Sequence, residues 1–201
     1  MTTREQFHEL ASSHTVVPVW RELVADLTTP VAAFARVVGD GPGFLLESVE
    51  HGERWSRWSF IGRNPLLTIV KSQGAIAVEG SLPEGVETGE GILDVIESLQ
   101  SKLKAPVLPE LPPMHSGIMG YIGYDVVREI ERLPNPPHDD LGLPDAVLSV
   151  IGDLAVFDHW RQRVVLIANA IVAPDAEEAE IDRAYDDAIA RLEALASDGA
   201  R

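Results

Sequence analysis

The sequence predicts an α+β protein with a largely antiparallel β-sheet and flanking helices. Between residues 44 and 80, short apolar or alternating runs are separated by Gly, Asn, Pro and Ser, which is typical of antiparallel strands. Amphipathic segments lie before, between and after these runs. Helical and strand patterns do not alternate regularly, which disfavours a parallel βαβ architecture. The chain has 201 residues, of which 45% are hydrophobic, enough for a substantial core.

The N-terminal segment predicts a helix followed by an edge strand. Thr3 and Gln6 form a capping-box pattern, and apolar residues at helical spacing follow, so we expect a helix over 3–12. The run 14–20 is β-branched and aromatic, but Pro18 cannot donate a backbone hydrogen bond. This run is therefore predicted to be an edge strand or an extended connection.

A second helix and a four-stranded meander are predicted next. Thr29 followed by Pro30 is typical of a helix start, and the helix is expected over 30–38. A turn at 72–75 contains the glycine of a hairpin. The four predicted strands are 44–50, 55–62, 65–72 and 75–80.

A proline-rich stretch divides the rest of the chain. An amphipathic helix is predicted over 91–104, and 106–113 holds four prolines, so it is expected to be a stiff connection between two blocks. The second block contains, in order, the glycine-rich segment 116–125, a short helix over 126–133, the loop 134–144, two long apolar strands over 147–157 and 163–172 joined by a hairpin at 158–162, and a final helix over 175–197.

The composition excludes several classes of protein. Lys and Arg number 16 against 32 Asp and Glu, a formal net charge of -16, which disfavours binding to nucleic acid or anionic lipid. The absence of cysteine excludes disulfides and thiolate metal sites and fits a reducing compartment. No apolar run approaches the roughly 20 residues that a membrane span needs. We therefore predict a cytoplasmic protein.

Familiar catalytic motifs are missing from the sequence. There is no Walker loop, G-x-S-x-G or H-E-x-x-H pattern, and the six histidines are scattered. Gly117, Gly120 and Gly123 do not form a dinucleotide fingerprint, and close backbone packing explains them better than a phosphate site. We predict no catalytic residue and no metal ligand in this chain.

One pair of polar residues stands out at the end of a predicted strand. Glu47 and Ser48 follow an apolar run, and adjacent strand residues point to opposite faces. Their oxygens suit an ammonium group or an indole N–H. The return strand would bring Arg57 or Ser59 alongside as partners for a ligand carboxylate. The alternative is a hairpin whose polar groups satisfy one another.

Three segments resemble one family in the family's own order. The segment 44–62, FLLESVEHGERWSRWSFIG, resembles the N-terminal signature of the anthranilate synthase large subunit, component I, although Ser56 and Trp58 stand where Gly and Tyr are more usual. The segment 116–134 resembles the glycine-rich GYxGYD signature of the same region, and 17–22 resembles its early IPVYRE-like element. The chain is identified as a member of this chorismate-utilising superfamily.

The resemblance implies a regulatory role. In this family the N-terminal region binds L-tryptophan as a feedback inhibitor, and the motif serine falls on Ser48. Glu47 and Leu46 carry over from the same motif, and Arg57 or Ser59 carries over less directly because spacing there varies.

The resemblance also implies a division of labour. Residues 1–201 would form the N-terminal regulatory domain, whereas chorismate and Mg²⁺ are bound by a C-terminal catalytic domain absent from this sequence. We therefore expect no cofactor and no anthranilate formation in this chain alone.

Two alternatives stay open. Aminodeoxychorismate synthase component I shares the same N-terminal fold, and there a tryptophan-like pocket would be structural. The chain could also be a docking module for the glutamine amidotransferase subunit, component II, through the acidic segment 175–201 or the loop 134–144.

Overall fold

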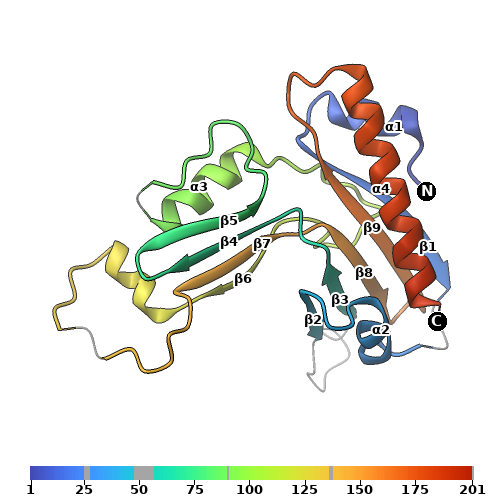
Figure 1. Cartoon of the computed structure of the whole chain (residues 1–201). Coiled ribbons are helices and arrows are strands. Elements are labelled where there is room, and N and C mark those ends of the chain that lie inside the picture. Colours follow the sequence, from blue (N-terminus) through green and yellow to red (C-terminus); the bar gives the residue numbers. More distant parts are fainter. Residues whose placement is uncertain (25–27, 48–56, 90, 136–137, 201) are drawn as a thin grey trace.

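The strands of the protein form two antiparallel sheets that diverge from a common junction (Figure 1). This is a computed structural model, and it describes residues 1–24, 28–47, 57–89, 91–135 and 138–200. The five-stranded sheet has the order β1-β9-β8-β3-β2, with β1 (Val16–Val24), β9 (Arg163–Ile171), β8 (Asp153–Asp158), β3 (Trp58–Arg63) and β2 (Gly43–Glu47). The four-stranded sheet has the order β5-β4-β7-β6, with β5 (Ala75–Gly80), β4 (Leu67–Ser72), β7 (Ala146–Val150) and β6 (Ile118–Ile122).

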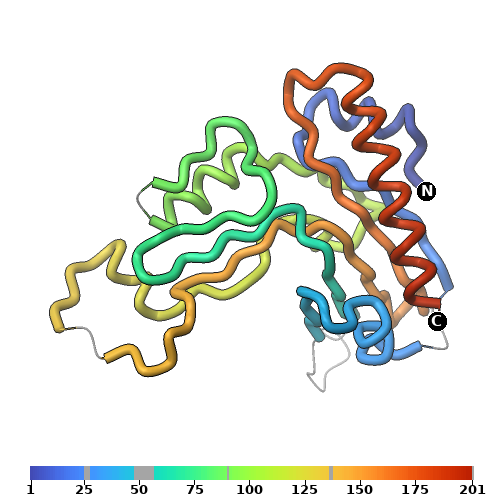
Figure 2. Tube along the Cα trace, viewed as in Figure 1, coloured from blue at the N-terminus to red at the C-terminus, as the bar shows by residue number. Residues whose placement is uncertain are grey.

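Helices pack on each sheet. One face of the five-stranded sheet is covered by three helices, α1 (Arg4–Ala11), α2 (Pro30–Val37) and the long α4 (Glu178–Gly199). The four-stranded sheet carries α3 (Ile92–Lys102) and the 3₁₀-helix η1 (Tyr124–Glu129). Both ends of the traced chain lie on the side of the five-stranded sheet (Figure 2). The mixture of helices with antiparallel sheets confirms the predicted α+β class.

The two largest cores lie between helices and sheets. In the first, Phe7 of α1 meets Tyr185 of α4 edge to face, with ring centroids 5.4 Å apart, and Leu192 and Leu195 of α4 are 1% exposed. In the second, Ile92, Val95 and Leu99 of α3 are fully buried on the four-stranded sheet. No helix of the described part of the chain is long and apolar enough to cross a membrane.

Local signals placed the N-terminal elements correctly. Thr3 and Gln6 form the capping box of α1, and Thr29 accepts a hydrogen bond from the backbone N–H of Ala32 at the start of α2. The strand that contains Pro18 is indeed an edge strand, since β1 pairs only with β9 in the described sheet.

The predicted four-stranded meander is wrong, because its strands belong to two sheets. β2 and β3 lie in the five-stranded sheet, and β4 and β5 lie in the other. The predicted strand 147–157 is likewise two strands, β7 and β8, which break at Gly152. A Cβ on Gly152 would lie 1.8 Å from the backbone oxygen of Asn64, where the chain passes from β3 to β4. The two segments in which the chain passes between the sheets, from β3 to β4 and from β7 to β8, therefore touch at this point.

The predicted helix over 126–133 is also wrong, because the helical segment is the shorter η1. Its Glu129 side chain accepts hydrogen bonds from the backbone N–H groups of Ile92 and Leu93, and so caps the start of α3. Arg128 donates to the backbone oxygen of Leu133 at 2.6 Å, which holds the following residues in a non-helical path.

A strand that the sequence did not predict, β6, crosses the glycine-rich segment. Gly120 has φ +157, and a Cβ there would lie 1.9 Å from the backbone oxygen of Val147 in β7. Close backbone packing therefore explains Gly120, as expected. The same expectation is wrong for Gly117, where a Cβ would meet nothing within 4 Å and the φ of +135 is what favours glycine.

A buried ionic network ties the junction of the sheets to α4. Asp153 is fully buried, and its carboxylate accepts hydrogen bonds from Arg191 of α4 and from Asn64. Arg191 also donates to the backbone oxygen of Asn169 at 2.6 Å, and the Asn169 amide donates to the backbone oxygen of His115 at 2.8 Å. The network thus connects α4 with both sheet crossovers.

Candidate functional site

The predicted ligand residues lie on the β2–β3 hairpin. Leu46 and Glu47 end β2, Ser59 belongs to β3, and Arg57 precedes β3 directly. Ser48, the serine of the LLES motif, lies outside the described residues. The structure therefore gives the positions of four of the five predicted residues.

Glu47 and Ser59 face each other across the hairpin. They are register partners, and the Ser59 hydroxyl donates to Glu47 Oε1 at 3.5 Å. Ser59 is 3% exposed, and its oxygen lies 2.8 Å from His159 Nε2. A hydroxyl that donates to Glu47 accepts from His159, so the three side chains form a short polar chain that ends at the exposed carboxylate.

Leu46 lies on the other face of the sheet from Glu47. Leu45, the residue before Leu46, packs in the core under the helices, whereas Phe44 packs with Trp58 and Phe60 on the opposite face. The alternation of strand side chains puts Leu46 on the side of Phe44 and leaves it 40% exposed. The predicted residues thus divide between two faces at the end of one strand.

Arg57 is held by a neighbouring carboxylate. Its Nε donates to Asp158 Oδ1 at 3.0 Å and its Nη2 to Asp158 Oδ2 at 2.5 Å. The guanidinium lies 4.3 Å from the ring centroid of Trp58 and 5.1 Å from that of Trp160. Two of its donors are therefore engaged by a residue of β8, outside the β2–β3 hairpin.

The ion pair stays charged over a wide pH range. Burial alone would raise the pKa of Asp158, but the hydrogen bonds from Arg57 and from the backbone N–H groups of Trp160 and Arg161 outweigh it. The pKa of this carboxyl is therefore lowered, and the hydrogen bond to Asp158 raises the pKa of Arg57. These hydrogen bonds hold the turn after β8 beside the start of β3.

Asp158 and His159 also belong to the site, although the sequence did not indicate them as site residues. Both lie in a segment correctly predicted as the hairpin 158–162, but their neighbour β3 lies far earlier in the chain. Only the pairing of β3 with β8 brings them to the site, and that pairing carries no local signal.

A small apolar cleft adjoins β2 on the face opposite Glu47. It has a volume of about 280 Å³, and its lining includes Phe44, Met119 and Tyr121. It lies at the start of β2, where Gly43 and Phe44 approach β6, and Leu46 and Glu47 at the other end of the strand do not line it.

The acidic residues of the described segments do not form a metal site. No group of three or more His, Asp or Glu side chains within residues 1–24, 28–47, 57–89, 91–135 and 138–200 could hold a metal ion.

No protein-family model matches the chain, but several curated proteins are similar over nearly all of it. It is 44% identical over 195 residues to anthranilate synthase component 1 of Mycolicibacterium smegmatis, 41% identical over 201 residues to that of Mycobacterium tuberculosis and 38% identical over 192 residues to that of Arthrobacter globiformis. These alignments cover 95 to 96% of this chain.

A solved structure supports the fold. Component I of anthranilate synthase from Streptococcus pneumoniae matches 85% of this chain with a TM-score of 0.50 and 24% sequence identity. The chain spans only 36 to 38% of the length of the relatives named above and 36% of the solved chain. Over the part of those proteins that it spans, the chain belongs to the anthranilate synthase component 1 family.

Proposed function

We propose that this chain is the tryptophan-sensing part of an anthranilate synthase component 1, which works in the cytoplasm. In the complete protein, chorismate and ammonia or glutamine would be converted to anthranilate and pyruvate, and L-tryptophan would inhibit this reaction. The observation that carries the proposal is the Glu47–Ser59–His159 chain at the end of β2, directly before Ser48 of the family motif.

The end of β2 suits a ligand with an ammonium group and an indole. Glu47 is the last residue of the strand, so a molecule placed beyond it reaches the carboxylate from one face and Leu46 from the other. The Glu47 carboxylate would accept the ammonium group, and Ser59 with His159 would hold that carboxylate in place. Leu46, 40% exposed on the other face at the same end of the strand, offers an apolar contact for the indole.

Inhibition would act through the rest of the protein. We propose that residues of the C-terminal catalytic domain complete the tryptophan pocket, because the chain spans little more than a third of its relatives. A ligand shared between two domains favours the domain arrangement that it binds more tightly. Its inhibition is limited by the difference between its binding free energies for the inactive and the active arrangement.

The relatives' name also supports a partner. A "component 1" implies a second component, and we propose that this is the glutamine amidotransferase subunit that supplies ammonia. The same name favours anthranilate synthase over aminodeoxychorismate synthase.

Calorimetry of L-tryptophan binding to the complete protein tests the proposed site. We expect Ser48→Arg to abolish measurable binding, since a long cation would enter a site that receives an ammonium group, and Ser48→Ala to weaken binding about fivefold through one lost hydrogen bond. Ser101→Arg, at an exposed position of α3, is the matched control and should bind as the parent does. Unchanged affinity in both Ser48 variants would remove this residue from the site.

The catalytic proposal has its own test. Because the resemblance places chorismate and Mg²⁺ binding in another part of the complete enzyme, we expect residues 1–201 alone to form no anthranilate from chorismate, ammonium and Mg²⁺. Anthranilate fluorescence reports the product, and turnover by this chain alone would contradict the proposed division between regulation and catalysis.

A further inference from the structure

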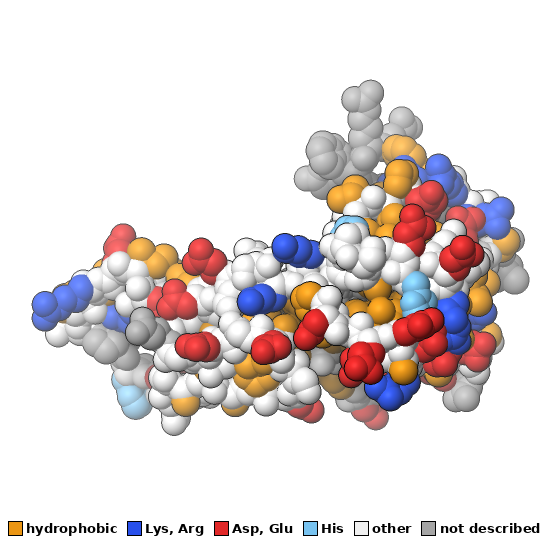
Figure 3. All heavy atoms as spheres, turned by 90° about the horizontal axis from the view of Figure 1, so that it is seen from above, with side chains coloured by type: hydrophobic (Ala, Val, Ile, Leu, Met, Phe, Trp, Pro, Cys, Tyr) orange, Lys and Arg blue, Asp and Glu red, His pale blue; other side chains and the backbone are white. Residues whose placement is uncertain are grey.

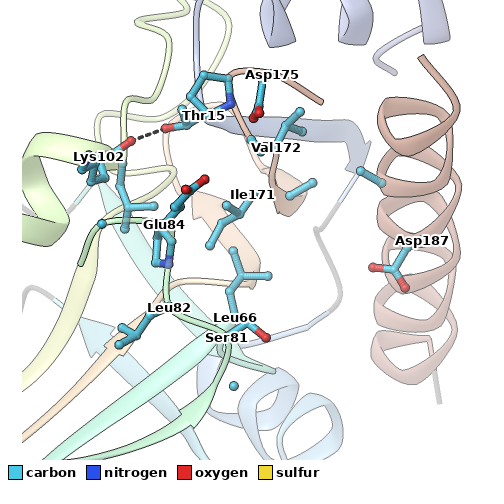
Figure 4. Close-up of a pocket in the computed structure, with 18 of the residues that line it drawn as sticks. Thr15, Leu66, Ser81, Leu82, Glu84, Lys102, Ile171, Val172, Asp175 and Asp187 are labelled. Atoms are coloured by element: carbon cyan, nitrogen blue, oxygen red, sulfur yellow. Dashed lines mark hydrogen bonds between the residues drawn. The ribbon is translucent and has the colours of Figure 1, made fainter. Parts of the chain in front are cut away.

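A large cleft lies between the two sheets, away from the β2–β3 hairpin. It has a volume of about 930 Å³, within the range of small-molecule sites. One wall comes from the end of α3 and the turn after β5, and the other from the end of β9 and from α4 (Figure 4). None of the four predicted tryptophan-binding residues that the structure describes, Leu46, Glu47, Arg57 and Ser59, lines it.

Hydrogen bonds at Thr15 fix the two walls relative to each other. The Thr15 hydroxyl donates to the backbone oxygen of Lys102 at 2.5 Å, and the backbone N–H of Lys104 donates to that hydroxyl at 2.8 Å (Figure 4). The backbone N–H of Val172 donates to the backbone oxygen of Thr15 at 2.9 Å. The end of α3 is thus joined to β1 and to the end of β9, so the cleft is built into the fold.

The cleft is mostly apolar inside. Side chains that pack on the core of the four-stranded sheet meet side chains at the end of β9 and on α4. The apolar lining includes Leu66, Leu82 and Leu103 on one side and Ile171, Val172 and Ala184 on the other. Such a lining favours a ligand with an apolar body.

The charged groups of the cleft are unbalanced toward the negative. Arg191 is already held, since its Nε donates to Asp187 at 2.9 Å and its Nη1 binds Asp153. Glu84, Asp175 and Lys102 line the cleft without an ion pair to any residue that the structure describes. Two carboxylates thus stand against one ammonium among the groups left for a ligand.

The positions of these charges differ. In Figure 4 the Glu84 side chain extends from the turn after β5 toward the loop that carries Asp175. The Lys102 ammonium lies over the same turn, 3.1 Å from where a Cβ on Gly85 would be. Lys102 is exposed and on a long stem, so it can move away from a bound cation, whereas the two carboxylates come from opposite walls.

We propose that this cleft binds a small amphipathic organic cation, a molecule with an apolar body and one ammonium group. The apolar body would lie on the lining of leucine, valine and proline, and the ammonium group would lie between Glu84 and Asp175. The field of the whole molecule acts in the same direction, because the formal net charge is -16 and acidic side chains outnumber basic ones on the face in Figure 3.

Three probes of one shape and different charge test the proposal on the complete protein. Phenethylamine, 2-phenylethanol and 3-phenylpropionate are titrated by saturation-transfer NMR, with L-tryptophan present at saturation. We expect the amine to bind most tightly and the acid least. Equal affinities, tightest binding of the acid, or no detectable binding of the amine would overturn the proposal.

Exposed charges allow matched variants that preserve the fold. Glu84→Gln with Asp175→Asn should weaken amine binding about two- to fivefold, the range of partly exposed ion pairs. Lys102→Met should strengthen it, whereas Lys104→Met, whose exposed side chain does not line the cleft, should leave it unchanged. If the double substitution leaves the affinity for phenethylamine unchanged, the probe binds outside this cleft, and the proposal is overturned.

The result is independent of the tryptophan proposal. The Ser48→Arg variant should bind phenethylamine as the parent does, even where it no longer binds L-tryptophan. Loss of amine binding in Ser48→Arg would instead show that the probe occupies the β2–β3 site, and would also overturn the proposal for the cleft.

Discussion

Asp158 has the most restrained carboxylate near the candidate site. It is 3% exposed and accepts hydrogen bonds from Arg57 and from the backbone N–H groups of Trp160 and Arg161. A buried acceptor that loses its charge leaves these donors poorly satisfied. This residue therefore fixes the turn that carries His159.

Asp158→Asn should lower the free energy of unfolding at pH 7 by about 2 kcal/mol, because it breaks a buried ion pair whose arginine still reaches solvent. Urea unfolding measures this difference. The control is Arg161→Gln, since Arg161 is 71% exposed and its Nε lies 3.9 Å from the same carboxylate. An equal loss in both variants would contradict the assigned role of the Arg57 pair.

The effect of Asp158 should depend on pH. Its pKa is lower in the folded protein than its ordinary value near 4, so its stabilisation is present above that value and disappears as the pH falls through the folded pKa. The difference between parent and Asp158→Asn should therefore shrink in a pH series from 7 to 3. A difference that grows toward low pH would have the wrong sign.

At the scale of elements, the β6–β7 pair depends on one close approach. Gly120→Ala should lower the free energy of unfolding by about 2–4 kcal/mol, because the new Cβ would lie 1.9 Å from the Val147 oxygen and must push the strands apart. Thermal unfolding measures the loss. Gly89→Ala meets nothing within 4 Å and is the control. A Gly120→Ala protein as stable as the control would exclude this contact.

Elements with local determinants were predictable from the sequence. The Thr3–Gln6 capping box, Thr29 before Pro30, and Pro18 in an edge strand each act within a few residues, and the structure has these elements where they were expected. The division into two sheets was not predictable, because it depends on Gly152 meeting Asn64, and these residues are far apart in the chain.

The candidate site shows the same limit. The LLES strand and its return strand were recognisable, and the pairing of Glu47 with Ser59 follows from the hairpin. His159 reaches Ser59 only through the pairing of β3 with β8, a contact between the two halves of the sequence. A hydrophobic pattern alone does not identify which strand pairs with which, so the contact between His159 and Ser59 could not be predicted from the sequence.

At the scale of the whole molecule, Asp153 connects the parts. Asp153→Ala should lower the free energy of unfolding by about 3–5 kcal/mol, because it leaves the Arg191 guanidinium without its buried partner. Asp187→Ala removes the exposed partner of the same arginine and is the control, with an expected loss below about 1 kcal/mol. Similar losses in chemical unfolding would show that the buried network does not hold the junction.

Feedback inhibition of the complete protein tests the central claim most directly. Anthranilate formation is measured at increasing L-tryptophan for the parent, Ser48→Arg and the control Ser101→Arg. We predict equal activity of all three without tryptophan, inhibition of the parent and of Ser101→Arg, and activity of Ser48→Arg that persists at tryptophan concentrations that silence the others. An inhibition curve of Ser48→Arg that coincides with that of the parent would contradict the assignment of tryptophan sensing to this strand.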